Sequence, residues 1–142
     1  MTPLDSLDAA LEALHFGFRG LTVEADRYLA TLGLSRVHHR ILYVIARVEG
    51  ITVGQLSATL GVSKQALHRP LTRLTEHRYV SMTRDAHNHR FKVLALTSDG
   101  QQVERTASQH ERDAVAEAFA RVSAQGRDDW YRIMGVLAAK LD

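Results

Sequence analysis

A helix predicted over residues 64–77 carries, on one face, side chains that can hydrogen-bond to bases and phosphates. At helical spacing this polar face collects Lys64, Gln65, His68, Arg69, Thr72, Arg73 and Glu76. The opposite face collects the apolar residues Leu67, Pro70, Leu71 and Leu74. Amide and guanidinium groups can donate to base edges in a major groove, and basic side chains pair with phosphates. The alternative interpretation is a plain helical hairpin whose polar face is only solvated.

The residues before this helix read as a shorter helix and a tight turn. In the stretch LSATLGVSKQAL, residues 56–67, Leu56 and Leu60 share one face of the first helix. Gly61 permits the backbone conformation of the turn, Val62 is expected to fill the angle between the helices, and Ser63 caps the second one. The spacing predicts a helix-turn-helix.

Two β-prone runs, residues 79–84 and 91–96, follow directly and predict a hairpin with a polar tip. Arg90 lies near this tip, where it could enter a minor groove beside the occupied major groove. Arg84 and Lys92 flank it and could bind phosphates. A hairpin in this place makes the expected fold a winged helix-turn-helix.

The charge distribution supports this interpretation. The whole chain of 142 residues has a net charge of only +2. Residues 60–92 contain seven lysines and arginines and two carboxylates, which gives +5, whereas residues 1–32 carry −3. A basic segment within a nearly neutral chain is what a phosphate-facing surface requires.

The N-terminal segment predicts one long helix that needs a partner. Thr2 can cap it, Pro3 suits its first position, and the helix should end near Leu32. Its apolar residues alternate in steps of three and four, as in a heptad seam: Leu4, Leu7, Leu11, Leu14, Phe18, Leu21, Ala25 and Tyr28. A helix of about 28 residues spans roughly 42 Å. So long a stripe exceeds what a small domain can cover, which favours a dimer over a core helix broken near Gly17 or Gly20.

The remaining segments complete the order α-α-α-α-β-β-α-α. We expect a second helix from the Ser35 cap to Val48 and a third one capped by Thr52. A fifth, capped by Thr97 or Ser98, should run to about Val122, and a break at Gln125–Gly126 should precede a last helix over 127–141. The chain of 142 residues is the size of one domain.

These residues resemble the MarR-type (multiple antibiotic resistance regulator) winged-helix transcription factors. The matching text is LSATLGVSKQALHRPLTRL at 56–74, Tyr79-Val80, Arg90, and Leu96-Thr97-Ser98-Asp99-Gly100. The resemblance implies a mainly α fold with a small β-hairpin wing, residues 35–97, and dimerisation helices at 1–34 and 98–142. It also implies a homodimer on a pseudo-palindromic double-stranded operator, usually a repressor, that a small aromatic or phenolic anion releases.

The sequence departs from the family pattern at three positions. Arg78 stands where a glycine often precedes the first wing strand, so a non-glycine residue must adopt an unusual backbone there or the turn differs. Asn88-His89-Arg90 replaces the common Asp-x-Arg, which removes the charge that orients the arginine. Pro70 lies inside the DNA-reading helix, where it removes a backbone donor and should bend the helix.

Two sets of site residues follow. For DNA we predict base contacts from Gln65, His68, Arg69 and Thr72, phosphate contacts from Ser63, Lys64, Arg73, Arg84 and Lys92, and a minor-groove contact from Arg90. For an aromatic anion the candidates near the cleft that the resemblance implies are His15, Phe18, Arg19, His39, Tyr43 and His110. Polar residues of a core or an interface would give the same pattern.

Several classes of function are excluded or disfavoured. Cysteine is absent, so no disulfide scaffold, zinc ribbon or thiol sensor is expected. No cofactor, metal or catalytic residue is predicted, because phosphate loops, nucleophile elbows and helical ligand pairs are missing. Neither a membrane span nor a signal peptide is expected, so the cytoplasm is the expected location. A protein-docking winged helix and a histidine-based metal-responsive regulator remain as alternatives.

Overall fold

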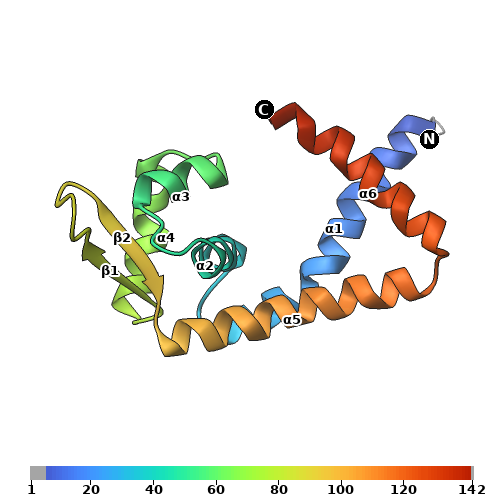
Figure 1. The fold of residues 1–142 in the computed structure, drawn as a ribbon. Coiled ribbons are helices and arrows are strands. Elements are labelled where there is room, and N and C mark those ends of the chain that lie inside the picture. Colours follow the sequence, from blue (N-terminus) through green and yellow to red (C-terminus); the bar gives the residue numbers. More distant parts are fainter. Residues whose placement is uncertain (1–5, 142) are drawn as a thin grey trace.

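The computed structural model describes residues 6–141, which form a helical molecule with one two-stranded hairpin (Figure 1). Its elements in chain order are α1 (Ser6–Thr31), α2 (Arg36–Arg47), α3 (Val53–Leu60), α4 (Lys64–Glu76), β1 (Val80–Arg84), β2 (Lys92–Leu96), α5 (Ser98–Ala120), α6 (Ala124–Ala138) and the 3-10 turn η1 (Ala139–Leu141). The predicted fold class and element order are therefore confirmed. The predicted caps at Thr2 and Pro3 lie outside the described residues.

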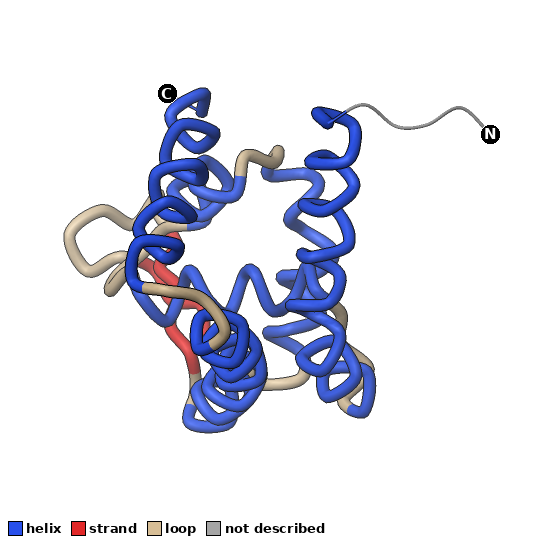
Figure 2. The backbone as a smooth tube through the Cα atoms, turned by 90° about the vertical axis from the view of Figure 1, so that its right-hand side faces the viewer, coloured by secondary structure: helices blue, strands red, loops and turns tan. Residues whose placement is uncertain are grey.

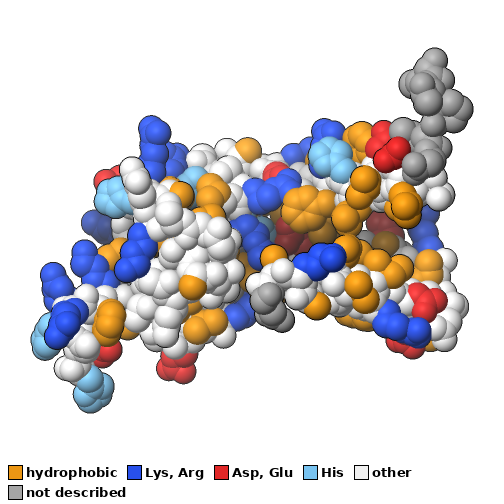
Figure 3. All heavy atoms as spheres, turned by 90° about the horizontal axis from the view of Figure 1, so that it is seen from above, with side chains coloured by type: hydrophobic (Ala, Val, Ile, Leu, Met, Phe, Trp, Pro, Cys, Tyr) orange, Lys and Arg blue, Asp and Glu red, His pale blue; other side chains and the backbone are white. Residues whose placement is uncertain are grey.

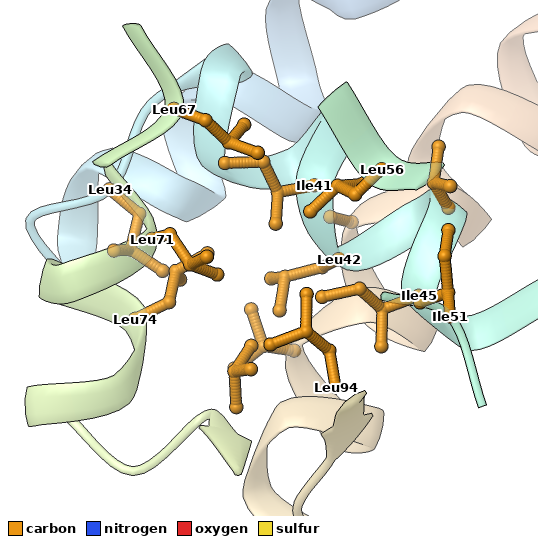
Figure 4. Packing of buried hydrophobic residues seen from close by; sticks show 14 of the residues in the cluster. Leu34, Ile41, Leu42, Ile45, Ile51, Leu56, Leu67, Leu71, Leu74 and Leu94 are labelled. Carbon is orange, nitrogen blue, oxygen red and sulfur yellow. The ribbon is translucent and has the colours of Figure 1, made fainter. Parts of the chain in front are cut away.

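One end of the molecule is a unit built around α2. In this unit α2 packs against α3, α4 and β2, and β1 pairs antiparallel with β2 from Val80↔Leu96 to Arg84↔Lys92. Ile41, Leu42 and Ile45 of α2 point into the core that Figure 4 shows, among leucines of the neighbouring elements. The labelled leucines around them are Leu34, Leu56, Leu67, Leu71, Leu74 and Leu94. This packing fixes the helix-turn-helix and the hairpin as one body.

The long helices form the other end. Helix α5 leads away from the hairpin and packs along α1, with Ala25 and Leu29 of α1 and Val103 and Ala107 of α5 buried. Helix α6 then turns back; it overlaps α1 in Figure 1 but stands apart from it in Figure 2. No residue of α6 is buried. Within residues 6–141, no helix is both long enough and apolar enough to cross a membrane.

The predicted break between the last two helices is misplaced. Helix α5 ends at Ala120, and α6 already begins at Ala124, so Gln125 and Gly126 lie within it. Ser123 causes the difference, because its Oγ accepts a hydrogen bond from the backbone N of Gly126 at 3.1 Å. An N-cap of this kind stabilises a helix start by about as much as an internal glycine costs.

Candidate nucleic-acid interface

The turn between α3 and α4 has the geometry that the sequence predicts, with one exception. Gly61 ends α3 in the left-handed region at φ 69°, and Ser63 Oγ accepts from the backbone N of Ala66 at 3.0 Å. Val62 does not fill the interhelical angle, because its side chain is 42% exposed. Its backbone is held instead: Ser57 Oγ donates to the Val62 carbonyl at 2.5 Å. A buried serine hydroxyl thus fixes the turn.

Helix α4 presents the predicted polar face to solvent. Leu67, Leu71 and Leu74 are buried, whereas the polar face contains exposed Ser63, Lys64, Gln65, His68, Arg69 and Arg73 and half-buried Thr72. Pro70 is half-buried and lies within the continuous helix, as predicted, so the residues from Lys64 to Arg69 still project together.

Arg73 differs from the other cations of α4. Its guanidinium lies against the α1–α2 turn, where a Cβ added to Gly33 would be 2.7 Å from Arg73 Nη2. Burial, and then the charge of Arg73, hold the pKa of His38 below its ordinary value. The uncharged ring suits the start of α2, because His38 Nδ1 accepts from the backbone N of Ser35 at 3.0 Å. Arg73 therefore borders the turn as well as the exposed face.

The hairpin tip is held by its own polar groups. Arg84 Nη1 donates to the His89 carbonyl at 2.7 Å, and Asp85 Oδ1 accepts from the backbone N of His87 at 3.0 Å. Asn88 Oδ1 accepts from the backbone N of Arg90 at 3.2 Å, so it shapes the loop and leaves the Arg90 guanidinium unrestrained by this contact. Arg84 and Lys92 stand opposite each other in the ladder.

A groove of about 460 Å³ lies between α4, the hairpin and the start of α3. Five of the ten predicted DNA-contacting residues line it, namely Lys64, His68, Thr72, Arg90 and Lys92. Lysine and arginine side chains surround this end of the molecule in the space-filling view, whereas hydrophobic side chains gather at the end with α1 and α6 (Figure 3). The groove can therefore accept a polyanion.

Phe91 is a groove residue that the sequence analysis missed. It lines the groove and is 51% exposed, and it precedes β2 because its backbone N donates to the Asn88 carbonyl at 3.0 Å. The expected strand therefore starts one residue later than predicted, at Lys92. Its signal in the sequence is an aromatic residue directly after Arg90, at the start of the β-prone run 91–96.

The junction between α4 and β1 contains Arg78, which stands where the family pattern often has a glycine. This residue adopts φ 62°, which is the first of the two alternatives given for it above, and Thr97 Oγ1 donates to its carbonyl at 2.6 Å. Thr97 also caps α5, and its backbone N donates to the Tyr79 carbonyl at 3.1 Å. A Cβ on Gly100 would lie 1.9 Å from that same Tyr79 oxygen. The start of α5 is thereby tied to the end of α4.

The six residues that the sequence suggests for binding an aromatic anion contact several different sets of neighbours. On α1, His15 packs against Phe16, and Arg19 lies 5.7 Å from the same ring. Phe18 lies under Arg36 at 4.6 Å, whereas His110 packs on Tyr28 at 6.0 Å.

On α2, Tyr43 has Arg47 at 3.5 Å and Arg40 at 5.5 Å from its ring centroid. His39 is buried, and its Nε2 lies 3.0 Å from Ser108 Oγ. A cavity of about 520 Å³ does form between α2, β2 and α5, but other side chains line it, including Arg47, Glu49, Gln101, Glu104 and Arg105. Within residues 6–141, no three His, Asp or Glu side chains are grouped as a metal site requires.

Comparison with known proteins gives matches along most of the chain. The model of the MarR family matches residues 32–90. The HTH-type transcriptional regulator PetP of Rhodobacter capsulatus is 34% identical over 121 residues, which cover 85% of this chain and 73% of that protein. These relatives are transcriptional regulators, so the prediction of a non-enzymatic protein is confirmed.

Solved structures share the fold at lower identity. Streptococcus pneumoniae FabT in complex with DNA superposes with a TM-score of 0.86 at 19% identity, over 96% of this chain and 97% of that one. A mutant of MarR from E. coli, complexed with operator DNA, gives a TM-score of 0.73 at 20% identity, over 94% of this chain and 99% of that one.

Proposed function

Because this chain belongs to the MarR family of transcriptional regulators, we propose that it binds a pseudo-palindromic operator as a homodimer and represses transcription. The observation that carries the proposal is the basic groove, in which α4 and the hairpin present Lys64, His68 and Arg90 to one space. FabT and the MarR mutant, which share this fold, were both solved with DNA. We therefore assign α4 to the major groove and Arg90 to the adjacent minor groove. Such a regulator acts in the cytoplasm.

The apolar surface of the long helices supports the homodimer. On α1, three large apolar side chains that continue the heptad seam, Leu11, Leu14 and Phe18, are exposed in the single chain. On α6 the exposed apolar residues include Trp130, Ile133 and Leu137. Exposed apolar area of this extent is characteristic of a protein interface. Residues 1–34 and 98–142 thus serve dimerisation in our proposal, and residues 35–97 serve DNA binding.

A small aromatic or phenolic anion is our proposed effector. The support is that arginines already lie over aromatic rings of α1 and α2: Arg36 over Phe18 and Arg47 over Tyr43. An anion that pairs with these arginines would compete with the present contacts. Thermal-shift screening with aromatic carboxylates and phenols tests it, and a screen in which no compound shifts Tm or weakens DNA binding would contradict it.

The proposed function is tested by binding to the region upstream of the protein's own gene. We expect a dimer by native mass spectrometry, and an affinity that depends on sequence and falls steeply with salt, because phosphate contacts release counterions. Random duplex of equal length is the control. Equal affinity for both duplexes would contradict sequence-specific binding, and binding to an acidic protein but not to DNA would favour a docking module.

A further inference from the structure

A buried polar cluster joins the DNA-binding unit to the long helices. We call it the seam cluster: His39 of α2 with Glu104, Ser108 and Glu111 of α5. His39, Ser108 and Glu104 are each at most 5% exposed, whereas the Glu111 side chain is 26% exposed and reaches solvent. Because α2 packs on α3, α4 and β2, a change at this seam acts on the whole DNA-binding unit.

Counting hydrogens fixes the tautomer of His39. Ser108 Oγ donates to Glu104 Oε2, whose carboxylate also lies 3.3 Å from Arg47 Nη1. A hydroxyl has one hydrogen, so in its 3.0 Å contact with His39 Nε2 the serine oxygen must accept. The neutral ring therefore carries its hydrogen on Nε2, and Nδ1 keeps a lone pair.

The lone pair on His39 Nδ1 faces the carboxylate of Glu111, and no hydrogen lies between the two groups. His39 Nδ1 lies 3.7 Å from Glu111 Oε2, which is too far for a hydrogen bond but within ion-pair distance. Nδ1 is thus a buried base beside an acid that reaches solvent. A proton that enters through Glu111 needs only this one short step to reach the ring.

The charged groups around His39 come from three helices. Burial lowers its pKa from the ordinary value, Glu104 opposes this, Arg40 and Arg47 of its own helix add to it, and Asp26 of α1 opposes it. For Glu111, burial raises the pKa, Arg40 and Arg36 oppose the rise, and Asp26 adds to it. One oxygen of Asp26, Oδ1, is buried without a hydrogen-bond partner in the described structure. Because burial holds the pKa of His39 below its ordinary value, the His39 ring is uncharged at neutral pH.

We propose that His39 takes up one proton at Nδ1 in mild acid, and that the charged ring and Glu111 then draw together, which shifts α2 on α5 and weakens DNA binding. The proton comes from solvent, no covalent bond other than the new N–H forms, and the ring gains one positive charge. The inference rests on the proposed function, since it names a regulatory input to the DNA-binding unit.

The stability of the free protein gives a test that does not need DNA. Because the folded pKa of His39 lies below the unfolded value of about 6.5, its contribution to stability is complete above that pH. The contribution is lost as pH falls from there through the folded pKa. Glu111 has the opposite sign, because its raised pKa favours the folded state below about pH 4.5 and that benefit fades as pH rises. The variant His39→Gln should remove the loss that begins near neutral pH.

The first experiment is a ¹⁵N NMR titration of the histidine rings in the full-length protein. At pH 7.5 we expect His39 as the Nε2–H tautomer, and on acidification we expect a proton at Nδ1 at a lower pH than in a free histidine. Glu111→Gln keeps the ring but removes the carboxylate that faces it, so the midpoint should fall further. An Nδ1–H tautomer at pH 7.5, or a midpoint equal to that of free histidine, would overturn the proposal.

The second experiment compares DNA affinity between pH 7.5 and pH 5.5, with duplexes selected in vitro on the wild-type protein. His68 of the groove is present in every variant, so its contribution cancels and the comparison between variants is decisive. We expect His39→Gln to retain more affinity at pH 5.5 than the wild type, by up to about fivefold for a one-unit difference in the pKa of His39 between free and DNA-bound protein, because a pKa below 6.5 leaves proton uptake incomplete at pH 5.5.

His110→Gln is the matched control, because this α5 histidine packs on Tyr28 and stands beside Glu111 in sequence. It should follow the wild-type pH profile. Identical profiles for His39→Gln and the wild type would overturn the regulatory role. If no duplex binds at all, the proposed function fails, and the NMR titration still decides whether the seam cluster takes up a proton.

Discussion

Arg69 stands at the centre of the exposed face of α4, between the groove residues His68 and Thr72. Within residues 6–141 its guanidinium has no hydrogen-bond or ion-pair partner, so its five donors are free for DNA. Arg69→Ala should cost roughly 1–3 kcal/mol on the selected operator and relax specificity, as expected for loss of a base contact. Competition binding with operator and random duplexes measures this, and an equal loss on both would make Arg69 a phosphate contact.

Lys64 provides the contrasting case on the same helix. It lines the groove at the start of α4, where a lysine is suited to phosphate. Lys64→Ala should weaken binding to all sequences alike and reduce the slope of log affinity against log salt by about one. A salt series on operator and random duplexes checks this. A loss restricted to the operator would contradict the assignment.

Phe91 contributes apolar contact area to the same groove. Since the side chain is half exposed, Phe91→Ala should change the free energy of unfolding by less than about 1 kcal/mol. In the groove, the lost contact with sugars or base edges should lower operator affinity several-fold, as for other apolar side chains at a minor groove. Phe91→Leu should retain part of the affinity. Unchanged binding by the alanine variant, with the fold intact, would show that Phe91 does not reach DNA.

Local periodicity was sufficient to predict which α4 residues are exposed, because helix spacing alone separates Lys64 and Arg69 from Leu67. The contacts of Arg73 with the Gly33 turn and of His39 with Ser108 could not be predicted. The second of these joins residues 69 positions apart, and no local pattern encodes such a pairing. The tertiary contacts of Arg73 and His39 are therefore the part of the arrangement that lies beyond local sequence patterns.

At the scale of elements, the start of α5 lies close against the α4–β1 junction because residue 100 is a glycine. Adding a Cβ at Gly100 places it 1.9 Å from the Tyr79 carbonyl oxygen, so backbone must move. Gly100→Ala should destabilise the protein by at least about 1–3 kcal/mol, as overpacking does. Because Thr97 bonds to Arg78 at the same junction, the strain also displaces the end of α4. Chemical denaturation measures the loss.

Gly17 is the matched control for this substitution. It lies within α1, and nothing lies within 4 Å of the position of an added Cβ. Gly17→Ala should therefore stabilise the helix by about 0.5–1 kcal/mol. If both alanine variants had equal stability, the close approach at Gly100 would not limit the fold.

The helix starts could be predicted from the sequence more accurately than the break between α5 and α6. The side-chain oxygens of Thr52, Ser63 and Thr97 each accept a hydrogen bond from the backbone N–H three residues later. An N-cap of this type can be recognised in the sequence. Ser123 follows the same rule, but the glycine at 126 also predicts a helix break. A glycine that is merely tolerated inside a helix looks the same in sequence as one that ends it.

At the scale of the whole molecule, charge and apolar area are separated between the two ends. Basic side chains surround the hairpin and α4, whereas apolar side chains cover the end formed by α1 and α6 (Figure 3). A homodimer that buries the apolar end would present two α4 helices about 34 Å apart, one turn of duplex. The net charge of +2 is uninformative because it sums the basic segment 60–92, at +5, with the acidic segment 1–32, at −3, and the rest of the chain.

The dimer can be tested with one apolar residue of α1. Leu11 is 66% exposed in the single chain, so Leu11→Glu should leave the fold of an isolated protomer intact. In a dimer that buries this position, an unpaired carboxylate would be desolvated, which costs several kcal/mol and should yield monomers by native mass spectrometry. Val37→Glu is the control, because Val37 is exposed on α2 in the DNA-binding unit. Each monomer would then bind one half-site independently. Monomers should therefore also lose operator affinity far beyond the effect of any single contact. A Leu11→Glu variant that remains dimeric would exclude this face of α1 from the interface.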